Sequence, residues 1–270
     1  RKIILMFQSS LKEAQAFQDF YLPNTGSYYR DNRNYSYDFA NNKNTTSLLS
    51  PYIRYRLISE EDIIKKTLSI NPFIKTEKFI QEIYWRTYWK GWLEHRPDVY
   101  DDYLKQRNEL LKNISDTIKF QKAINGETHL TFFNDWVKKL KEDGYLHNHV
   151  RMWFASIWIF TLDLPWQLGA NFFMENLLDG DPASNTLSWR WVAGIQTKGK
   201  HYLARKNNII KYANINIKED IKLNEKAVCI EENKSYFPKD LIFDNTTNND
   251  LDSIVIPTDE LNFIENNKNK

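Results

Sequence analysis

The sequence contains little of several residue types, and each scarcity excludes a class of protein. Among 270 residues there is one cysteine, Cys229, so the chain forms no internal disulfide and no zinc site built from cysteines, which suits a reducing compartment. No apolar run is long enough to span a bilayer, because Asp163 and Pro165 interrupt the longest one. The basic and then apolar start lacks the small-residue cleavage site of a signal peptide. We therefore expect a cytoplasmic protein without a membrane segment.

An excess of one charge sign is also missing. The chain has 37 Lys and Arg against 35 Asp and Glu, for a net charge of +2. A nucleic-acid partner is thus neither required nor excluded, since a local basic patch is enough to bind phosphates. Aromatic residues, in contrast, are abundant at 15% of the chain. Such rings usually fill a core, but they also stack on bases or relay electrons.

Helical periodicity runs through most of the chain, with no repeats and no alternation of strands and helices. It predicts helices over 9–22, from Ser59, and over 76–95, 101–124, 131–144, 148–164 and 166–178. Residues 24–46, rich in Asn, Tyr and Ser, are predicted to form a loop. The sequence therefore predicts an all-α domain over 1–213. Residues 214–270 are predicted to form an irregular extension, with a short strand or hairpin at most, packed on the domain and ending in disorder.

Two segments carry charges that need partners. The stretch "LHNHVRMW" has the letters of a His-Asn-His metal nuclease, but a helix follows directly, so we expect no metal site and interpret Asn148 as an N-cap. Arg151 then lies in the first turn, where the helix dipole disfavours a cation unless an anion is near. Further on, "DGDPASN" carries Asp179 and Asp181, whose burial would also require partners. Arg151 is a candidate partner for one of these two carboxylates.

Two other segments allow a structural and a functional interpretation. "TTSLLSP" is either an ordinary helix start or a turn whose N–H groups hold phosphate. Glu82, Trp85, Arg86 and Trp89 are three or four residues apart, so they share one helix face. That face is either a packing surface with a Glu–Arg pair or a base-stacking platform beside a cation.

Taken together, the blocks "TSLLSPYIRYRLIS", "EIYWRTYW", "GYLHNHVRMW", "WQLGANFFMENLLDGDPASNTLSWRWVAG" and "YLARKNNI" resemble the helical FAD-binding domain of the photolyase/cryptochrome flavoproteins. They follow the family's order and span residues 9–212. The resemblance implies a bound FAD in an all-α domain. By resemblance, the cofactor-binding residues would be Tyr29, Thr46, Ser47, Leu48, Leu49, Ser50, Arg86, Asn148, Arg151, Asp179, Gly180, Asp181 and Asn185.

The resemblance also implies roles within that set. Tyr29 and residues 46–50 would hold the diphosphate, and Arg151 and Asp179 would pair beside the isoalloxazine edge. Asp181 would bind the polar edge of the flavin, and Asn185 would face its N5 atom. An amide at that position favours repair over signalling, because cryptochromes often carry Asp or Cys there.

Electron relay is implied as well, but the sequence departs from the family here. Trp189 would be the proximal electron donor and Trp166 the next. The usual third Trp falls in residues 100–120, which contain only Tyr100, Tyr103 and Phe120. Either a Tyr, or Trp153 or Trp158, would replace it, or photoreduction would be slow.

The implied substrate is UV-damaged DNA. Enzymes for cyclobutane pyrimidine dimers line the lesion cavity with Glu, Asn, Met and two Trp, which match Glu82, Asn148, Met152, Trp85 and Trp191 in this sequence. The rest of the expected DNA-binding set is Arg86, Trp89 and His149. The cations expected to meet DNA phosphates are Arg205, Lys198, Lys200 and Lys206. The catalytic residues implied are Glu82, Asn148, Asn185, Trp189 and Trp166. The expected activity is light-driven dimer repair by a carbon–carbon lyase that acts as a monomer.

Two alternatives and two further departures remain. The chain could be a cryptochrome-like photoreceptor or flavin-binding protein without repair activity, or a helical nucleic-acid-binding domain without flavin. The family's α/β antenna domain has no room before residue 9, so we expect one of three explanations: the sequence is a piece of a longer protein, a separate antenna protein is its partner, or the form is naturally short. Arg56 occupies a position where the family usually has Gly, which often serves a positive φ.

Overall fold

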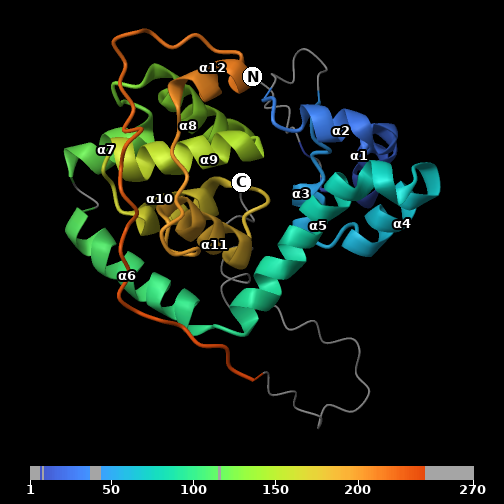
Figure 1. Cartoon of the computed structure of the whole chain (residues 1–270), viewed down its shortest axis with the longest axis horizontal. Helices are drawn as coiled ribbons and strands as arrows, with labels where there is room; N and C mark the ends of the chain where they lie inside the picture. The colour runs from blue at the N-terminus through green and yellow to red at the C-terminus, as the bar shows by residue number, and fades with distance from the viewer. Residues whose placement is uncertain (1–6, 8, 37–43, 115–116, 241–270) are drawn as a thin grey trace. The chain divides into compact units, whose positions relative to one another are not determined.

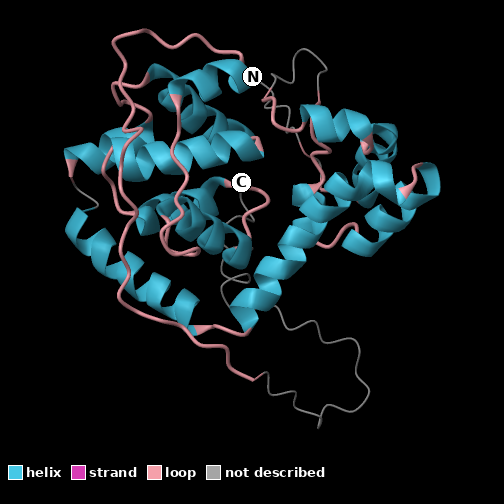
Figure 2. Cartoon of the chain, viewed as in Figure 1, coloured by secondary structure: helices cyan, strands magenta, loops and turns pink. Residues whose placement is uncertain are grey.

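The computed structural model describes residues 7, 9–36, 44–114 and 117–240, and every regular element among them is a helix (Figures 1 and 2). This confirms the all-α prediction. In chain order the elements are α1 (Leu11–Tyr21), η1 (Leu22–Asn24), α2 (Ser27–Asn32), α3 (Ser50–Arg54), α4 (Glu60–Ile70), α5 (Phe73–Glu94), α6 (Asp98–Ile114), α7 (Ile118–Asn125), α8 (Thr131–Asp143), α9 (Asn148–Ser156), η3 (Ile157–Thr161), α10 (Trp166–Asn176), α11 (Pro182–Ala193) and α12 (Lys206–Ala213).

Local capping signals fix most helix ends. Ser10 and Ser59 accept hydrogen bonds from the backbone N–H three residues on, at the starts of α1 and α4. Gly144 and Gly194 adopt left-handed conformations that end α8 and α11. These interactions lie within one turn of the chain, which is why the sequence predicted the boundaries at Ser10, Ser59 and Gly144; helix α11 and its end at Gly194 were not predicted.

Two separate clusters of buried apolar side chains organise the helices. One is formed by α1–α4 and the first turns of α5, around residues such as Tyr21, Tyr52 and Phe79. The larger one is formed by α6–α12, around Phe154, Trp158 and their neighbours. Figure 1 shows α5 running between the two groups of helices. The second half of α5 therefore connects the cores and contacts α11.

Several predicted elements are wrong in detail. The short helix α2 lies inside the predicted loop 24–46, because Tyr29 anchors it in the first core despite weak periodicity. The predicted helix 101–124 is two helices, α6 and α7. The predicted helix 148–164 changes to a π-helical turn, η3, at Ile157. The spacing of Phe79, Ile83, Tyr84 and Trp92 predicts an apolar stripe along 76–95, but Tyr84 is 57% exposed.

The start of α9 also differs from the prediction. Its N-cap is His147, whose Nδ1 accepts a hydrogen bond from the backbone N–H of His149 at 3.1 Å. Asn148 is the first helical residue and not the cap. A histidine ring nitrogen here replaces the more usual short polar side chain, which the sequence pattern does not reveal.

The part of the extension that the structure describes is well fixed. Residues 214–238 belong to the same compact unit as the helices, and no strand occurs within the described 214–240. Backbone and side-chain hydrogen bonds attach this segment, among them Ile230 N–H to the Ala193 carbonyl at 3.0 Å and Asn224 Nδ2 to the Phe160 carbonyl at 3.1 Å. We call residues 214–238 the strap. The predicted disordered end falls on 241–270, outside the described residues.

Arg56 occupies a left-handed backbone conformation, with φ of 58°. A side chain there costs about 1–2 kcal/mol relative to the right-handed region. We therefore expect Arg56→Gly to raise the free energy of unfolding by about 1 kcal/mol, measured by urea denaturation. The matched control is Lys78→Gly in the helical backbone of α5, which should lower it by about 1 kcal/mol. Destabilisation by Arg56→Gly would show that the turn needs the arginine side chain.

Candidate cofactor site

The expected pair between Arg151 and Asp179 is present. Arg151 Nη2 donates to Asp179 Oδ2 at 2.9 Å, and Arg151 Nε donates to the Leu146 carbonyl at 2.7 Å. The Asp179 side chain is only 4% exposed. The pair joins the first turn of α9 to the segment before α11, and it supplies the anion that Arg151 needs at a helix N-terminus.

Asp181 faces two cations of α5. Its Oδ1 accepts from the Ser184 backbone N–H at 2.9 Å as the N-cap of α11, and its Oδ2 lies 3.5 Å from Lys90 Nζ and 3.8 Å from Arg86 Nη2. Burial alone would raise the pKa of Asp181, but Arg86, Lys90 and the Ser184 N–H hold it below its usual value. The carboxylate therefore stays ionised in the site.

Asn185 and Trp189 follow on the next turns of α11. Asn185 Nδ2 donates to the Ala170 carbonyl at 2.8 Å, which orients the amide so that Oδ1 is the acceptor turned away from α10. Trp189 is buried, and its ring contacts Trp158 and Phe173 edge-on at centroid distances of 6.3 and 5.1 Å. A Cβ added to Gly169 would lie 2.3 Å from the Trp189 ring, so only glycine permits this approach of α10 and α11.

The segment 46–50 forms a tight turn before α3. Leu48 has a positive φ of 58°, and Leu49 N–H lies 3.5 Å from Ser47 Oγ. The side chains of Leu48 and Leu49 are buried in the first core, so only their backbone groups can face a ligand. Successive residues in left- and right-handed conformations form a concavity of N–H groups that suits an anion.

Two other predicted cofactor residues are engaged with the protein. The Tyr29 ring packs edge-on against Phe79 at 5.0 Å, and burial together with the Glu82 carboxylate raises the pKa of its phenol. The Gly180 carbonyl accepts a hydrogen bond from Arg54, which ties the Asp179–Asp181 turn to α3.

Buried polar atoms without a hydrogen-bond partner gather in this region. They are Arg86 Nε and Nη2, Asp179 Oδ1, Ser184 Oγ and Trp189 Nε1. Each buried polar group left unpaired costs about 1–3 kcal/mol, so such a concentration indicates a bound polar ligand. Hydrogen-bond donors and hydrogen-bond acceptors occur together among these atoms, which fits a flavin dinucleotide, since that ligand carries both. Among the described residues no group of three or more potential metal ligands exists.

The predicted lesion-binding residues of α5 differ in exposure: Glu82 and Trp85 are accessible, whereas the Arg86 side chain is only 13% exposed. Trp85 is 47% exposed and stacks on Trp89 at a centroid distance of 5.6 Å. Glu82 lies 3.7 Å from Arg33 Nε at the end of α2. Arg33 was not predicted to be part of the site, because the sequence around it looked like loop.

The residues of α9 and α11 expected at the lesion are linked by Tyr202. Its ring stacks on Trp191 at 5.9 Å, and its hydroxyl lies 3.3 Å from His149 Nε2. The other ring nitrogen of His149 lies 2.9 Å from the Asn34 carbonyl, and the ring stacks on Trp153. Both ring nitrogens of His149 are thus engaged with the protein.

Asn148 is exposed at the start of α9, with Nδ2 4.0 Å from Met152 Sδ. Among the described residues no other hydrogen bond holds its amide. Residues 33 and 34 contact Glu82 of α5 and His149 of α9 respectively, so the same short segment lies beside both groups of predicted lesion residues.

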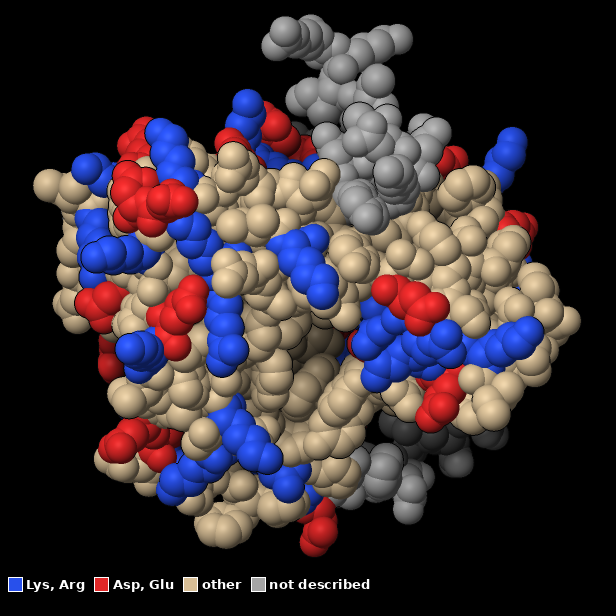
Figure 3. Space-filling model, turned by 45° about the horizontal axis from the view of Figure 1, so that its top comes forward, with Lys and Arg blue, Asp and Glu red and all other residues tan. Residues whose placement is uncertain are grey.

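One face of the molecule is hollowed. Figure 3 shows a hollow with Lys and Arg side chains gathered around its rim. Near α12, Arg205 and Lys211 line an open polar hollow of about 490 Å³ together with Tyr212. Of the cations expected to meet phosphates, Arg205 is the one that lines this hollow, while Lys206 Nζ donates to the Lys218 carbonyl at 2.6 Å.

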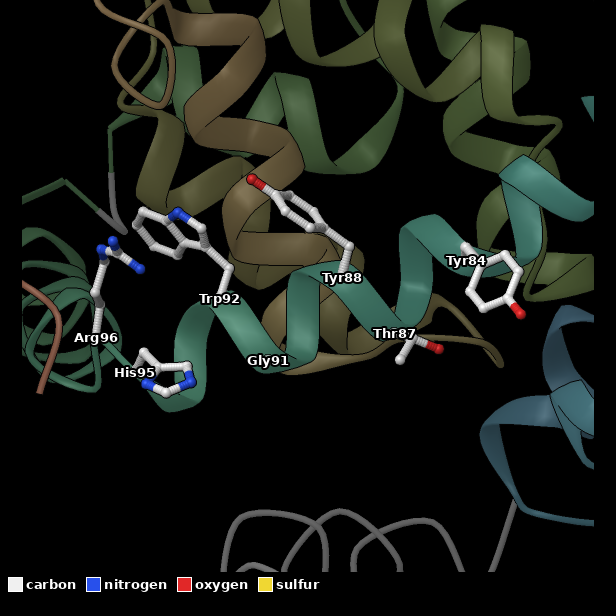
Figure 4. Close-up of a pocket in the computed structure, with 7 residues that line it drawn as sticks. All are labelled: Tyr84, Thr87, Tyr88, Gly91, Trp92, His95 and Arg96. Carbon is white, nitrogen blue, oxygen red and sulfur yellow. The ribbon is translucent and has the colours of Figure 1, made fainter. Parts of the chain in front are cut away.

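A second open hollow, of about 500 Å³, lies along α5 (Figure 4). Tyr84, Tyr88, Trp92 and Arg96 line it, and the Arg96 guanidinium lies 4.6 Å from the Trp92 ring centroid. No separate signal in the sequence marks this hollow, since its aromatic residues have the spacing of an ordinary apolar stripe.

His147 gives the site a pH dependence. Burial, then the nearby His149 and Arg151, lower the pKa of His147 to about 4. Because the folded pKa is below the unfolded value, the unfolded chain binds the proton first, and stability is lost as the pH falls from about 6.5 towards 4. We expect a contribution of about 2–3 kcal/mol to that loss. In His147→Asn, which can still cap α9, urea denaturation across this range should show a smaller loss; an identical loss would exclude His147 as the cause.

Comparison with known proteins identifies the family. Residues 79–220, more than half of the chain, match the family described as the FAD binding domain of DNA photolyase. The chain therefore belongs to this family of flavin-binding helical domains, and FAD is its cofactor. The orphaned polar groups around Arg86, Asp179 and Trp189 fit that cofactor.

Individual relatives agree with this family assignment. The deoxyribodipyrimidine photo-lyases of Streptomyces griseus and Agrobacterium fabrum are 31% and 32% identical over 56% of this chain. Those matches cover 33% and 32% of the relatives, so the chain spans about a third of the length of the curated relatives it matches. None of the described helices is long and apolar enough to cross a membrane.

Solved structures show the same fold. A bacterial class III photolyase from Agrobacterium tumefaciens matches 77% of this chain and 44% of its own, with a TM-score of 0.64 and 26% identity. A cryptochrome from Synechocystis matches the same shares of the two chains, with a TM-score of 0.62 and 23% identity. The cryptochrome match supports the fold alone.

Proposed function

We propose that this chain is the FAD-binding catalytic domain of a light-driven lyase that repairs cyclobutane pyrimidine dimers in DNA. The observation that carries the proposal is the convergence of Arg86, Arg151, Asp179 and Asp181 from α5, α9 and the α10–α11 segment on one set of orphaned polar atoms. Exposed stacking rings and polar groups lie next to it on the same helices. The relatives named as photo-lyases support the reaction class.

In the proposed mechanism, bound reduced FAD supplies the light-driven electron. The chain's own residues prepare the lesion. Trp85 and Trp191 would stack on a dimer that has left the duplex, which costs least for a damaged, poorly stacked base pair. Glu82 and Asn148 would hydrogen-bond its carbonyl and N–H edges and stabilise negative charge on the opening ring.

Around the cofactor, the residues act by charge and orientation. Asp181, kept ionised by Arg86 and Lys90, would accept from a flavin N–H. Asn185, whose Nδ2 is held by Ala170, would present Oδ1 as an acceptor. Trp189, buried against α10, would be the nearest oxidisable side chain of the protein.

Spectroscopy and an illuminated repair assay test the proposal. The purified protein should be yellow, and after chemical reduction it should remove dimers from oligonucleotides under blue or near-UV light but not in the dark. We expect Glu82→Ala to retain flavin absorbance and to lose repair by about 10- to 100-fold. Glu94→Ala, an exposed carboxylate on the same helix, is the matched control and should repair normally.

The two alternatives predict different results. A flavin-containing protein without repair would be a cryptochrome-like photoreceptor or flavin-binding protein. A colourless protein that binds DNA would exclude the flavin chemistry altogether.

A further inference from the structure

The strap carries a tyrosine to the side of a buried tryptophan. Trp166, at the start of α10, stacks on Tyr103 at a centroid distance of 5.5 Å. Across the same region, the Arg190 guanidinium lies 5.9 Å from the Trp166 ring centroid and 5.4 Å from that of Tyr236, which belongs to the strap. Trp166 and Tyr236 thus contact the same guanidinium.

Trp166 is connected to the candidate cofactor site through α10. Gly169, one turn after Trp166, lies against the Trp189 ring. Trp158 contacts both segments, since its Nε1 donates to the Pro165 carbonyl at 2.9 Å and its ring meets Trp189 edge-on. Oxidisable rings therefore extend from Trp189 towards the strap without an intervening solvent layer.

Tyr236 has a proton acceptor. Its hydroxyl donates to Asp102 Oδ2 at 2.9 Å, and Lys234 pairs with the same carboxylate. Burial and the Asp102 hydrogen bond raise the pKa of Tyr236, while Lys234 and Tyr236 lower that of Asp102. At neutral pH the phenol is protonated and the carboxylate is ionised, which is the arrangement needed to move a proton from one to the other.

Tyr103 lacks such an acceptor. No hydrogen-bond acceptor lies at its buried hydroxyl among the described residues, and the cation above its ring, Arg107, only donates. Oxidation of a phenol without loss of its proton leaves a buried cation, which is costly. Tyr103 therefore serves as packing beside Trp166.

Arg190 sits between the two rings, and its charge would oppose a positive charge on Trp166. Glu232 of the strap neutralises it through two hydrogen bonds, to Nη1 at 2.8 Å and to Nη2 at 2.7 Å. The strap thus supplies both the neutralising carboxylate and the tyrosine.

We propose that Tyr236 is a redox-active tyrosine that returns an electron to Trp166, with Asp102 as its proton acceptor. This inference rests on the FAD binding that the proposed function requires, but it concerns the oxidised cofactor before repair: light-excited oxidised flavin would be the oxidant, taking one electron from Trp189, which in turn takes one from Trp166. One electron then passes from Tyr236 to the oxidised indole of Trp166, and the phenolic proton passes to Asp102 Oδ2. The products are a neutral tyrosyl radical, a protonated Asp102 and a restored Trp166; an external thiol later reduces the radical.

Flash photolysis of the FAD-loaded full chain, read by transient absorption and electron paramagnetic resonance, tests this assignment. We expect a neutral tyrosyl radical in the unaltered protein, its loss in Tyr236→Phe, and a longer-lived tryptophan radical in its place. Asp102→Asn should lower the radical yield by about tenfold or more, because the proton acceptor is removed. Tyr103→Phe is the control and should retain the radical.

The opposite pattern would overturn the assignment: a radical that survives Tyr236→Phe, or one that disappears in Tyr103→Phe. Circular dichroism and flavin absorbance show whether each variant is folded and loaded. A repair assay on the chemically reduced protein distinguishes failure of this inference from failure of the proposed function. If repair proceeds and no tyrosyl radical forms in the unaltered protein, only the role of Tyr236 is wrong, whereas absence of flavin or repair removes the function itself.

Discussion

Arg151→Met is expected to lower the free energy of unfolding by about 3 kcal/mol or more and to abolish flavin binding. Removal of the guanidinium leaves the buried Asp179 carboxylate without its partner, and breaking a buried ion pair from one side typically costs about 3–5 kcal/mol. Urea denaturation and the flavin absorbance of the purified variant measure the two effects.

Two further variants make this prediction specific. The double variant Arg151→Met with Asp179→Leu replaces the whole pair by apolar side chains, so it should recover most of the lost stability but remain colourless. Arg30→Met removes a fully exposed pair with Asp31 and should unfold like the unaltered protein. Flavin retained by the double variant would contradict the placement of the cofactor beside this pair.

The second large effect is expected from Gly169→Ala. The added Cβ would lie 2.3 Å from the Trp189 ring and 2.9 Å from Trp158 Nε1, so the ring or the helices must move. Overpacking of this kind typically costs about 1–3 kcal/mol. We expect a loss near 3 kcal/mol by urea denaturation, a changed tryptophan fluorescence spectrum and a lower flavin content.

Gly91→Ala is the matched control, since Gly91 is also helical and nothing lies within 4 Å of an added Cβ. Alanine is the better helix former, so this variant should gain about 0.5–1 kcal/mol. Equal losses in the two variants would indicate that helix backbone, and not contact with Trp189, makes Gly169 necessary.

Much of the helical framework could be predicted from the sequence because its signals act over a few residues. Ser10 and Ser59 cap the starts of α1 and α4, and Gly144 ends α8, each through contacts within one turn. Where the prediction failed, a distant contact decided the outcome. Helix α2 forms inside a polar segment because Tyr29 packs on Phe79 of another helix. The cap of α9 is a local exception, because His147, a residue type that seldom caps helices, takes the place expected for Asn148.

The candidate site divides in the same way. The charge of Arg151 at a helix start required an anion, and Asp179 is that anion at 2.9 Å. The approach of Arg33 to Glu82, the link from Trp191 through Tyr202 to His149, and the hollow along Tyr88 and Trp92 carry no comparable local signal.

The sequence by itself determined that this protein is an all-α member of the FAD-binding photolyase domain family and which residue types are available for its chemistry. Only the tertiary structure decided that the strap returns to α6 and α11, where Glu232 pairs with Arg190 and Tyr236 donates to Asp102. The physical reason is the sequence separation over which each kind of interaction acts. Caps and periodicity act between residues up to about four apart, whereas Asp102 and Tyr236 are 134 positions apart and meet only because the packed helices hold both against the same surface.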